Sequence, residues 1–377
     1  MDLDDFRDIA PYRGQDFLDA MARVKQNPKG ITSLLASVST LETREQQENL
    51  ERKVQHVLSI LDEVTDYDQF QRRLTAGVFM PTIIENSITE FTYSGAETLD
   101  SSMAYLYVSN HRDIVLDCAL IDIALAGSGQ MLCEMAVGDN LLANEFSTDL
   151  FKLNGGVTVK RTLPMREKYI ESMRLSAYLV ELISEANKSV WIAQKSGRAK
   201  DGLDITSPAI IKMLHLSQRK KGVSFSEVIS KVRIVPVAVS YEYDPVDVIK
   251  AREAVHSSAV GEREKRLYED LISISKGLSG FKGRVHTAFG TPLEGPYATS
   301  EEVAAEIDRQ IHSLYRLWPT NLFAYDYLNG TDTYSDRYAD FDCDGFLNRF
   351  KGLKKEVRSY ALNAYANPVR SFLSTEA

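Results

Sequence analysis

The chain has 377 residues, of which 44% are hydrophobic and 26% are charged, and its formal net charge is −9. This is the composition of a globular protein, long enough for about two to three domains. The acidic balance argues against a nucleic-acid-binding protein, because such a protein presents a basic face to the phosphate backbone.

The N-terminal segment MDLDDFRDIAPYRG is acidic and lacks the basic and then apolar order of a signal peptide. The most apolar stretch, 114–126, is interrupted by Asp117 and Asp122, so it falls short of the roughly 18 apolar residues of a membrane-spanning helix. The three cysteines are widely spaced and form no CxxC pair, which favours packed, reduced thiols. We therefore expect a cytoplasmic protein that does not span a membrane but can lie on its surface as a peripheral protein.

The spacing of apolar residues divides the chain into three segments. Over 1–95, intervals of three and four residues, as in QDFLDAMARVKQ, predict an N-terminal helical domain without strands. Over 96–330, short runs such as MAYLYVS and SVWIAQ alternate with helical patterns, which predicts an α/β domain with a mostly parallel central sheet flanked by helices. Over 331–377, a polar turn precedes an amphipathic helix that we expect to end before Pro368.

Ligands of parallel sheets bind beyond the carboxyl ends of the strands, so the residues that follow each predicted strand are candidates for function. These candidates are His111, Arg112, Asp113 and Asp117 after MAYLYVS; Lys160 and Arg161 after GGVTV; and Lys195, Ser196, Gly197 and Arg198 after SVWIAQ. The cations suit a phosphate, to which arginine can donate two hydrogen bonds at once. The histidine suits a general base at neutral pH.

Pro236 interrupts the apolar run VRIVPV. Because proline cannot donate a hydrogen bond within a sheet, its position predicts an edge strand, a bulge or a strand end shaped for a ligand.

Four blocks of the sequence, SNHRDIVLD, GGVTVKR, QKSGRAKDG and IVPV, resemble in order and interval the motif blocks of the glycerolipid acyltransferases. This superfamily includes the glycerol-3-phosphate and 1-acylglycerol-3-phosphate acyltransferases. The resemblance covers residues 100–245. The phrases GDNLL, SYEYDP and HSLYRLWPTNLFAYDYL are similar to a soluble bacterial branch and extend the resemblance to residue 330.

The resemblance implies an enzyme that moves a fatty acyl chain from acyl-CoA or acyl carrier protein to the hydroxyl of glycerol 3-phosphate or a lysophospholipid. His111 matches the histidine that deprotonates the hydroxyl, and Arg161 and Arg198 match arginines expected on the acceptor's phosphate or polar head. Pro236 matches the proline that shapes the cleft. We expect the substrate site to be completed by Arg112, Lys160, Lys195, Ser196 and Gly197. Acyl transfer of this kind needs no metal, no cofactor and no covalent enzyme intermediate.

Two departures from the family pattern affect the site. The family has four residues between the histidine and its aspartate, whereas here Leu116 takes that place and Asp117 lies one residue later. Either Asp113 or Asp117 can orient the imidazole. We favour Asp117, because a turn can absorb one residue as a bulge, and Asp113 can instead cap the following helix. The third block has Ser196 in place of a glutamate expected to bind the acceptor or brace the site.

These departures leave alternative functions open. One is a catalytically impaired lipid- or acyl-binding protein of the same fold, and another is an acyltransferase for a lipid head without phosphate, such as an acyl-amino acid. The basic clusters 218–222 and 351–358 are either solvated faces or weak attachment sites for anionic lipid or an acidic carrier protein. The sequence predicts neither the acyl chain length nor the oligomeric state.

Overall fold

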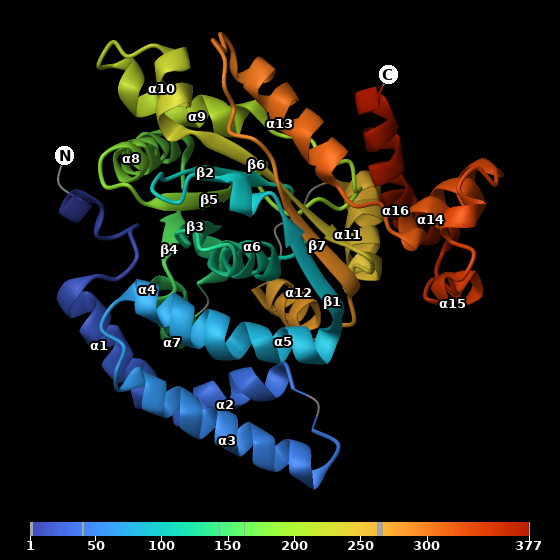
Figure 1. Ribbon diagram of the computed structural model, residues 1–377, viewed down its shortest axis with the longest axis horizontal. Helices are drawn as coiled ribbons and strands as arrows, with labels where there is room; N and C mark the ends of the chain where they lie inside the picture. Colours follow the sequence, from blue (N-terminus) through green and yellow to red (C-terminus); the bar gives the residue numbers. More distant parts are fainter. Residues whose placement is uncertain (1–2, 40, 143, 162, 262–266, 377) are drawn as a thin grey trace.

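The computed structural model describes residues 3–39, 41–142, 144–161, 163–261 and 267–376. Its strands form one central sheet with helices on both faces (Figure 1). The strands are β1 (Ile88–Ser94), β2 (Leu106–Ser109), β3 (Cys133–Gly138), β4 (Gly156–Val159), β5 (Ser189–Ala193), β6 (Ile234–Tyr241) and β7 (Gly283–Phe289).

The helices of the first half are α1 (Gly14–Lys25), α2 (Pro28–Ser37), α3 (Arg44–Leu61), α4 (Tyr67–Phe70), the π-helix η2 (Gln71–Phe79), α5 (Met80–Ser87), α6 (Leu116–Gly127), α7 (Glu145–Leu153) and α8 (Met165–Ser184). Those of the second half are α9 (Pro208–Arg219), α10 (Phe225–Val232), α11 (Asp247–Val260), α12 (Leu267–Ser279), α13 (Ser300–Leu314), α14 (Pro319–Asn329), α15 (Cys343–Asn348) and α16 (Lys355–Glu376). Short 3₁₀ turns are η1 (Leu3–Phe6), η3 (Ala96–Thr98), η4 (Asp139–Leu141) and η5 (Ser335–Arg337).

The strands lie in the order β1-β7-β6-β2-β5-β3-β4. Among the described residues, neighbouring strands run parallel apart from the antiparallel pair β6 and β7. The expected α/β fold with a mostly parallel sheet is therefore confirmed. Strand β2 lies between β5 and β6, so the residues that follow it emerge near the middle of the carboxyl edge.

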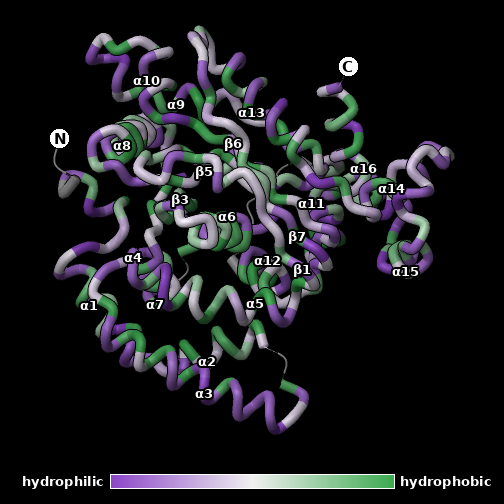
Figure 2. Tube along the Cα trace, viewed as in Figure 1, coloured by the Kyte–Doolittle hydropathy of each residue, from purple (hydrophilic) through white to green (hydrophobic). Residues whose placement is uncertain are grey.

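Two apolar clusters bury the two faces of the sheet. On β2, Leu106 and Val108 face a cluster formed with α8, α9, α10 and α13, whereas Tyr107 faces a cluster formed with α5, α6 and α12. This alternation follows from the two-residue period of a strand. Helix α6 is buried over most of its length and is largely hydrophobic in Figure 2, as expected for a helix covered on several sides. Each fully buried aliphatic side chain contributes about 1.5–3 kcal/mol to folding.

The N-terminal region departs from its prediction in one element. Helices α1 to α4 and η2 share an apolar cluster that includes Phe17, Leu35 and Leu74, but the stretch expected to be wholly helical ends in strand β1. This strand pairs in parallel with β7, nearly 200 residues away by sequence number (Ile88 opposite Gly283). Its apolar pattern is weak because several of its residues are exposed. The division into domains at residues 95 and 330 stays a prediction.

The C-terminal helix also departs from its prediction. Helix α16 continues through Pro368 instead of ending before it. A proline inside a helix leaves the carbonyl four residues earlier without its usual donor, and that carbonyl, on Ala364, packs against Gly202. A Cβ atom on Gly202 would lie 2.1 Å from the Ala364 oxygen, so the glycine makes this close approach possible.

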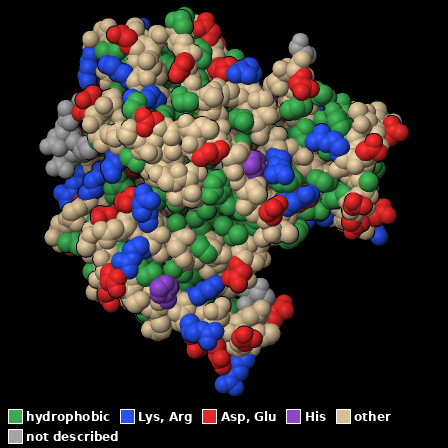
Figure 3. All heavy atoms as spheres, viewed as in Figure 1, with side chains coloured by type: hydrophobic (Ala, Val, Ile, Leu, Met, Phe, Trp, Pro, Cys, Tyr) green, Lys and Arg blue, Asp and Glu red, His purple; other side chains and the backbone are tan. Residues whose placement is uncertain are grey.

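Acidic and basic side chains are interspersed on the face seen in Figure 3, where apolar side chains gather near the centre. Over the described residues, no helix combines the length and the apolar character needed to cross a bilayer.

Candidate active site

His111 lies at the carboxyl end of β2, where its neighbour Asn110 fixes the backbone. The buried Asn110 amide accepts a hydrogen bond from Val239 N (2.8 Å) and donates one to Val239 O (3.0 Å), which ties the end of β2 to β6. The next residue, His111, points its ring toward Trp191 of β5, with ring centroids 5.7 Å apart in an edge-on contact. The imidazole is therefore held by two neighbouring strands.

Asp117, in the first turn of α6, holds the imidazole through its Nδ1 atom. The distance from His111 Nδ1 to Asp117 Oδ2 is 2.8 Å. The same oxygen accepts hydrogen bonds from the backbone N–H groups of Arg112 (2.6 Å) and Asp113 (2.9 Å), and Oδ1 accepts one from the Tyr241 hydroxyl (2.8 Å). A carboxylate with these donors favours the tautomer with hydrogen on Nδ1, which leaves the Nε2 lone pair free. Within the described residues, Nε2 has no hydrogen-bond partner.

Asp113 occupies the other position considered for orienting the histidine, and it serves a different purpose. Its Oδ1 accepts hydrogen bonds from the N–H groups of Val115 and Leu116, both at 2.9 Å, at the start of α6. Burial, together with nearby Asp117, raises the pKa of Asp113 above its ordinary value. The imidazole is thus paired with Asp117, and Asp113 caps the helix.

A cavity of about 210 Å³ lies beside His111. Its lining combines a few polar groups with apolar side chains from β3, β5 and η4. The lining residues are His111, Ile114, Ala136, Val137, Gly138, Asn140, Leu141, Arg161, Trp191, Ala193, Gly197, Arg198 and Asp270.

Arg161 and Arg198 bring two guanidinium groups to this cavity. Arg161 follows β4, and its backbone N–H donates to Asp139 Oδ1 (3.1 Å) in η4. Arg198 follows β5, in a loop fastened to the site by a hydrogen bond from Ala199 N to His111 O (2.7 Å). Residues that follow β2, β4 and β5, which the sequence analysis selected as candidates, therefore line one cavity.

Neither guanidinium has a hydrogen-bond or ion-pair partner among the residues that the structure describes, and Arg198 Nη1 is buried and unsatisfied. Burial lowers the pKa of Arg161, against the opposing effect of Asp139. A buried cation without a partner is costly, and an anionic ligand would remove that cost. The cavity is therefore suited to a phosphate or another anion.

An apolar cavity of about 290 Å³ adjoins the first one and shares Ile114, Val137 and Leu141 with it. Its walls come from α2, η2, α5, α6, α7 and α12, so the N-terminal helices supply much of its surface. The few polar groups in it include Thr75 and Asn154, whose side chains hydrogen-bond to each other at 2.6 Å. Such a lining suits an alkyl chain.

Of the other residues predicted in the second and third blocks, one lines the His111 cavity and three lie outside it. Gly197 lines the His111 cavity with φ +79°, which glycine adopts without strain. Lys195 and Ser196 belong to the same turn but do not line the cavity, and Ser196 is exposed. Lys160 forms ion pairs with Asp8 (2.6 Å) and Glu171 (3.2 Å) and also lies outside it.

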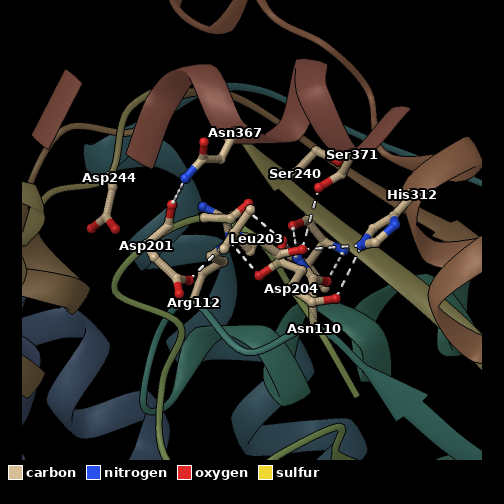
Figure 4. Close-up of polar contacts among 12 residues, drawn as sticks. Asn110, Arg112, Asp201, Leu203, Asp204, Ser240, Asp244, His312, Asn367 and Ser371 are labelled. Atoms are coloured by element: carbon tan, nitrogen blue, oxygen red, sulfur yellow. Dashed lines mark hydrogen bonds and ion pairs between the residues drawn. The ribbon is translucent and has the colours of Figure 1, made fainter. Parts of the chain in front are cut away.

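Arg112, which was predicted to contact substrate, does not line the His111 cavity. Its guanidinium pairs with buried Asp204 at 2.5 Å (Figure 4). It also lies over the Tyr315 ring at 5.3 Å. Burial alone would lower the pKa of Arg112, but Asp204 keeps it above its ordinary value. Asp204 also accepts from Asn110 Nδ2 (3.1 Å), and its carbonyl accepts from His312 Nε2 (3.1 Å). Arg112 is therefore part of a buried polar network that braces the loop.

Pro236 is likewise placed differently from its prediction. It lies in β6, an interior strand, where it is buried and pairs with Val108 of β2. Its carbonyl accepts a hydrogen bond from Gly290 N (2.8 Å). It lines neither the His111 cavity nor the apolar cavity. Its position, next to the start of the β6–β7 ladder at Val237, explains how the sheet tolerates a residue without an N–H.

The sequence analysis did not predict several residues of the site. Trp191, Asn140 and Asp270 line the cavity, and Tyr241 holds Asp117. Tyr241 ends β6 and Asn140 follows β3, so the strand-end rule could have found both. Asp270 lies on α12 and gave no local signal.

Part of the chain matches a known protein family. Residues 90–240 match the family model described as Acyltransferase, which includes His111, Arg161 and Arg198. A similar solved structure is the 1-acyl-sn-glycerophosphate (LPA) acyltransferase PlsC from Thermotoga maritima, at 13% identity and a TM-score of 0.35, covering 78% of this chain and 91% of that chain. No curated protein matches the chain. The match therefore relates residues 90–240, which include the His111 site, to the acyltransferase family.

Proposed function

We propose that this protein transfers a fatty acyl chain from acyl-CoA or acyl carrier protein to the hydroxyl of glycerol 3-phosphate or a lysophospholipid, with His111 as the general base. The observation that carries this proposal is the position of His111, fixed by Asp117 at 2.8 Å and facing a cavity with two unpaired guanidinium groups. The family match supports acyl transfer in general, and the choice of acceptor rests on the cations.

In the proposed reaction, Nε2 of His111 takes the proton of the acceptor hydroxyl as the oxygen attacks the thioester carbonyl. The tetrahedral intermediate then expels the thiolate, and the imidazolium returns the proton to the sulfur. Asp117 stabilises the imidazolium and keeps Nε2 directed at the acceptor, which is a positioning role. General base catalysis of this kind contributes on the order of 100- to 10,000-fold in rate.

The two adjoining cavities divide the substrates by polarity. Arg161 and Arg198 would bind the acceptor's phosphate, since both lack partners within the described residues. The apolar cavity would take the acyl chain, and each buried methylene would contribute about 0.8 kcal/mol. The cavities share Ile114, Val137 and Leu141, which lie between the chain and the reacting carbonyl in this arrangement.

An acceptor panel tests this proposal. Purified protein is supplied with labelled acyl-CoA or acyl carrier protein and with glycerol 3-phosphate, lysophosphatidate, or an acyl-amino acid that has no phosphate. We expect acyl transfer to a phosphate-bearing acceptor and none with His111→Ala. Transfer only to the acceptor without phosphate would move the function to that lipid class. Thioester binding without turnover on any acceptor would identify an impaired acyl-binding protein.

The expected cellular setting follows from these substrates. An enzyme that uses cytoplasmic thioesters and releases an amphiphilic product would work in the cytoplasm, in transient contact with the membrane surface.

A further inference from the structure

The first two turns of α8 carry exposed apolar side chains close to the His111 cavity. Met165, Tyr169 and Ile170 are 88%, 53% and 46% exposed, and every residue from Pro164 to Ile170 is exposed. This segment begins three residues after Arg161, which lines the cavity. An exposed apolar side chain in isolation is ordinary, but several at one helix end indicate a surface used for binding.

Two more exposed apolar side chains follow a residue that lines the same cavity. Leu271 and Ile272 on α12 are exposed and directly follow Asp270, which lines the cavity. Asp270 accepts a hydrogen bond from Asn140 of η4 at 3.2 Å, which joins α12 to the cavity wall. Twelve large apolar side chains of the described residues are strongly exposed, and five of them lie in these two segments. This concentration is what distinguishes the region from the rest of the surface.

The composition of this surface favours lipid over an acidic carrier protein. The α8 segment mixes Arg166 and Lys168 with Glu167, and Glu269 and Asp270 precede Leu271, so this surface has no positive excess to attract a carrier protein rich in acidic residues. By contrast, methionine, isoleucine and leucine insert readily at the level of lipid headgroups, and tyrosine prefers that interface.

We propose that Pro164–Ile170 and Leu271–Ile272 form a docking surface for a phospholipid bilayer, bound mainly by insertion of apolar side chains. Its position beside the cavity would let an amphiphilic acceptor enter, and its product leave, without crossing water. This purpose rests on the proposed function, but the binding itself does not. Binding through apolar insertion should persist at high salt, whereas attachment through the basic clusters 218–222 and 351–358 would be lost there.

The test is sedimentation of the full-length protein with vesicles of phosphatidylcholine and phosphatidylglycerol, at low and high salt. We expect Met165→Asp combined with Ile170→Asp to weaken binding by about tenfold or more. The matched control is Leu18→Asp, on α1, where the leucine is 50% exposed, and a second control is Lys220→Glu with Lys221→Glu. Both controls should bind as the wild type does. In a Tyr169→Trp variant, the emission of the new tryptophan should shift to the blue when vesicles are added. The native Trp191 and Trp318 are buried, so their emission should stay unchanged.

The following outcomes decide the proposal. It is overturned if the wild type does not sediment with vesicles, or if only the Leu18 or the lysine variants are released. It is also overturned if the α8 variant loses affinity for acyl carrier protein while its vesicle binding is unchanged. Turnover of the α8 variant with glycerol 3-phosphate and a short-chain acyl-CoA, both water-soluble, should equal that of the wild type. If the wild type transfers no acyl group but binds vesicles through α8, the docking surface stands and the proposed function fails.

Discussion

Two groups of cations lie close to the end of β2 and differ in how their charges are compensated. Arg161 and Arg198 border the His111 cavity without a partner in the described residues, whereas Arg112, next to His111 in sequence, pairs with Asp204 at 2.5 Å. A paired and buried cation is already satisfied and can contribute to stability, while an unpaired one is available to a ligand. We therefore expect pairing, and not sequence distance from the histidine, to separate binding residues from structural ones here.

The largest effect, on turnover, is expected when the aspartate that orients the His111 imidazole is replaced. Asp117→Asn would replace an acceptor of the Nδ1 hydrogen and favour the wrong tautomer, so turnover should fall by about 100- to 10,000-fold. Steady-state kinetics of the variant measures this fall. Asp113→Asn is the matched control, because that residue caps α6 and asparagine caps a helix about as well as aspartate, so both turnover and the free energy of unfolding should change little. Equal turnover losses in both variants would remove the distinction between them.

The paired cation should show its role in stability. Arg112→Ala would leave Asp204 buried without its partner, so the free energy of unfolding should fall by about 3–5 kcal/mol. Denaturant unfolding measures the free energy of unfolding of this variant. Arg198→Ala is the control, because it breaks no ion pair and should leave that free energy almost unchanged. A stable Arg112→Ala protein with a raised acceptor KM would instead return Arg112 to the substrate site.

The unpaired cations should show their role in acceptor binding. Arg161→Ala and Arg198→Ala should each raise the KM for a phosphate-bearing acceptor by about tenfold to a hundredfold, since a hydrogen bond to a charged group contributes about 1.5–3 kcal/mol. The KM for the acyl donor is measured in parallel and should change little. An unchanged acceptor KM in both variants would rule out a phosphate clamp.

The smallest effect is expected at Lys160, which has surface partners of its own. Lys160→Met removes ion pairs with Asp8 and Glu171, and such partly exposed pairs contribute about 0–1 kcal/mol. Thermal unfolding should therefore show a small shift, and the acceptor KM should equal that of the wild type. A raised KM would place Lys160 with Arg161 as a binding residue.

The sequence predicted well those features that depend on local pattern. The alternation of strands and helices predicted the α/β sheet, and the strand-end rule selected His111, Arg161 and Arg198, which line one cavity. Their catalytic and binding roles remain predictions.

Features that depend on distant contacts were missed or misplaced. Arg112 follows the same strand-end rule as His111, but its partner Asp204 lies 92 residues later. Strand β1 is stabilised by β7, and the apolar cavity is closed by N-terminal helices that pack against α6 and α12. Pro236 shows the same limit, because its interior position follows from which strands flank it and not from the run VRIVPV itself.

Turnover of His111→Gln at saturating acyl thioester and acceptor tests the central claim most directly. Glutamine keeps a polar side chain beside Asp117 but cannot accept the hydroxyl proton as a base. We predict a fall of about 100- to 10,000-fold in turnover, with an unfolding midpoint equal to that of the wild type. Turnover close to that of the wild type would contradict the assignment of His111 as the general base.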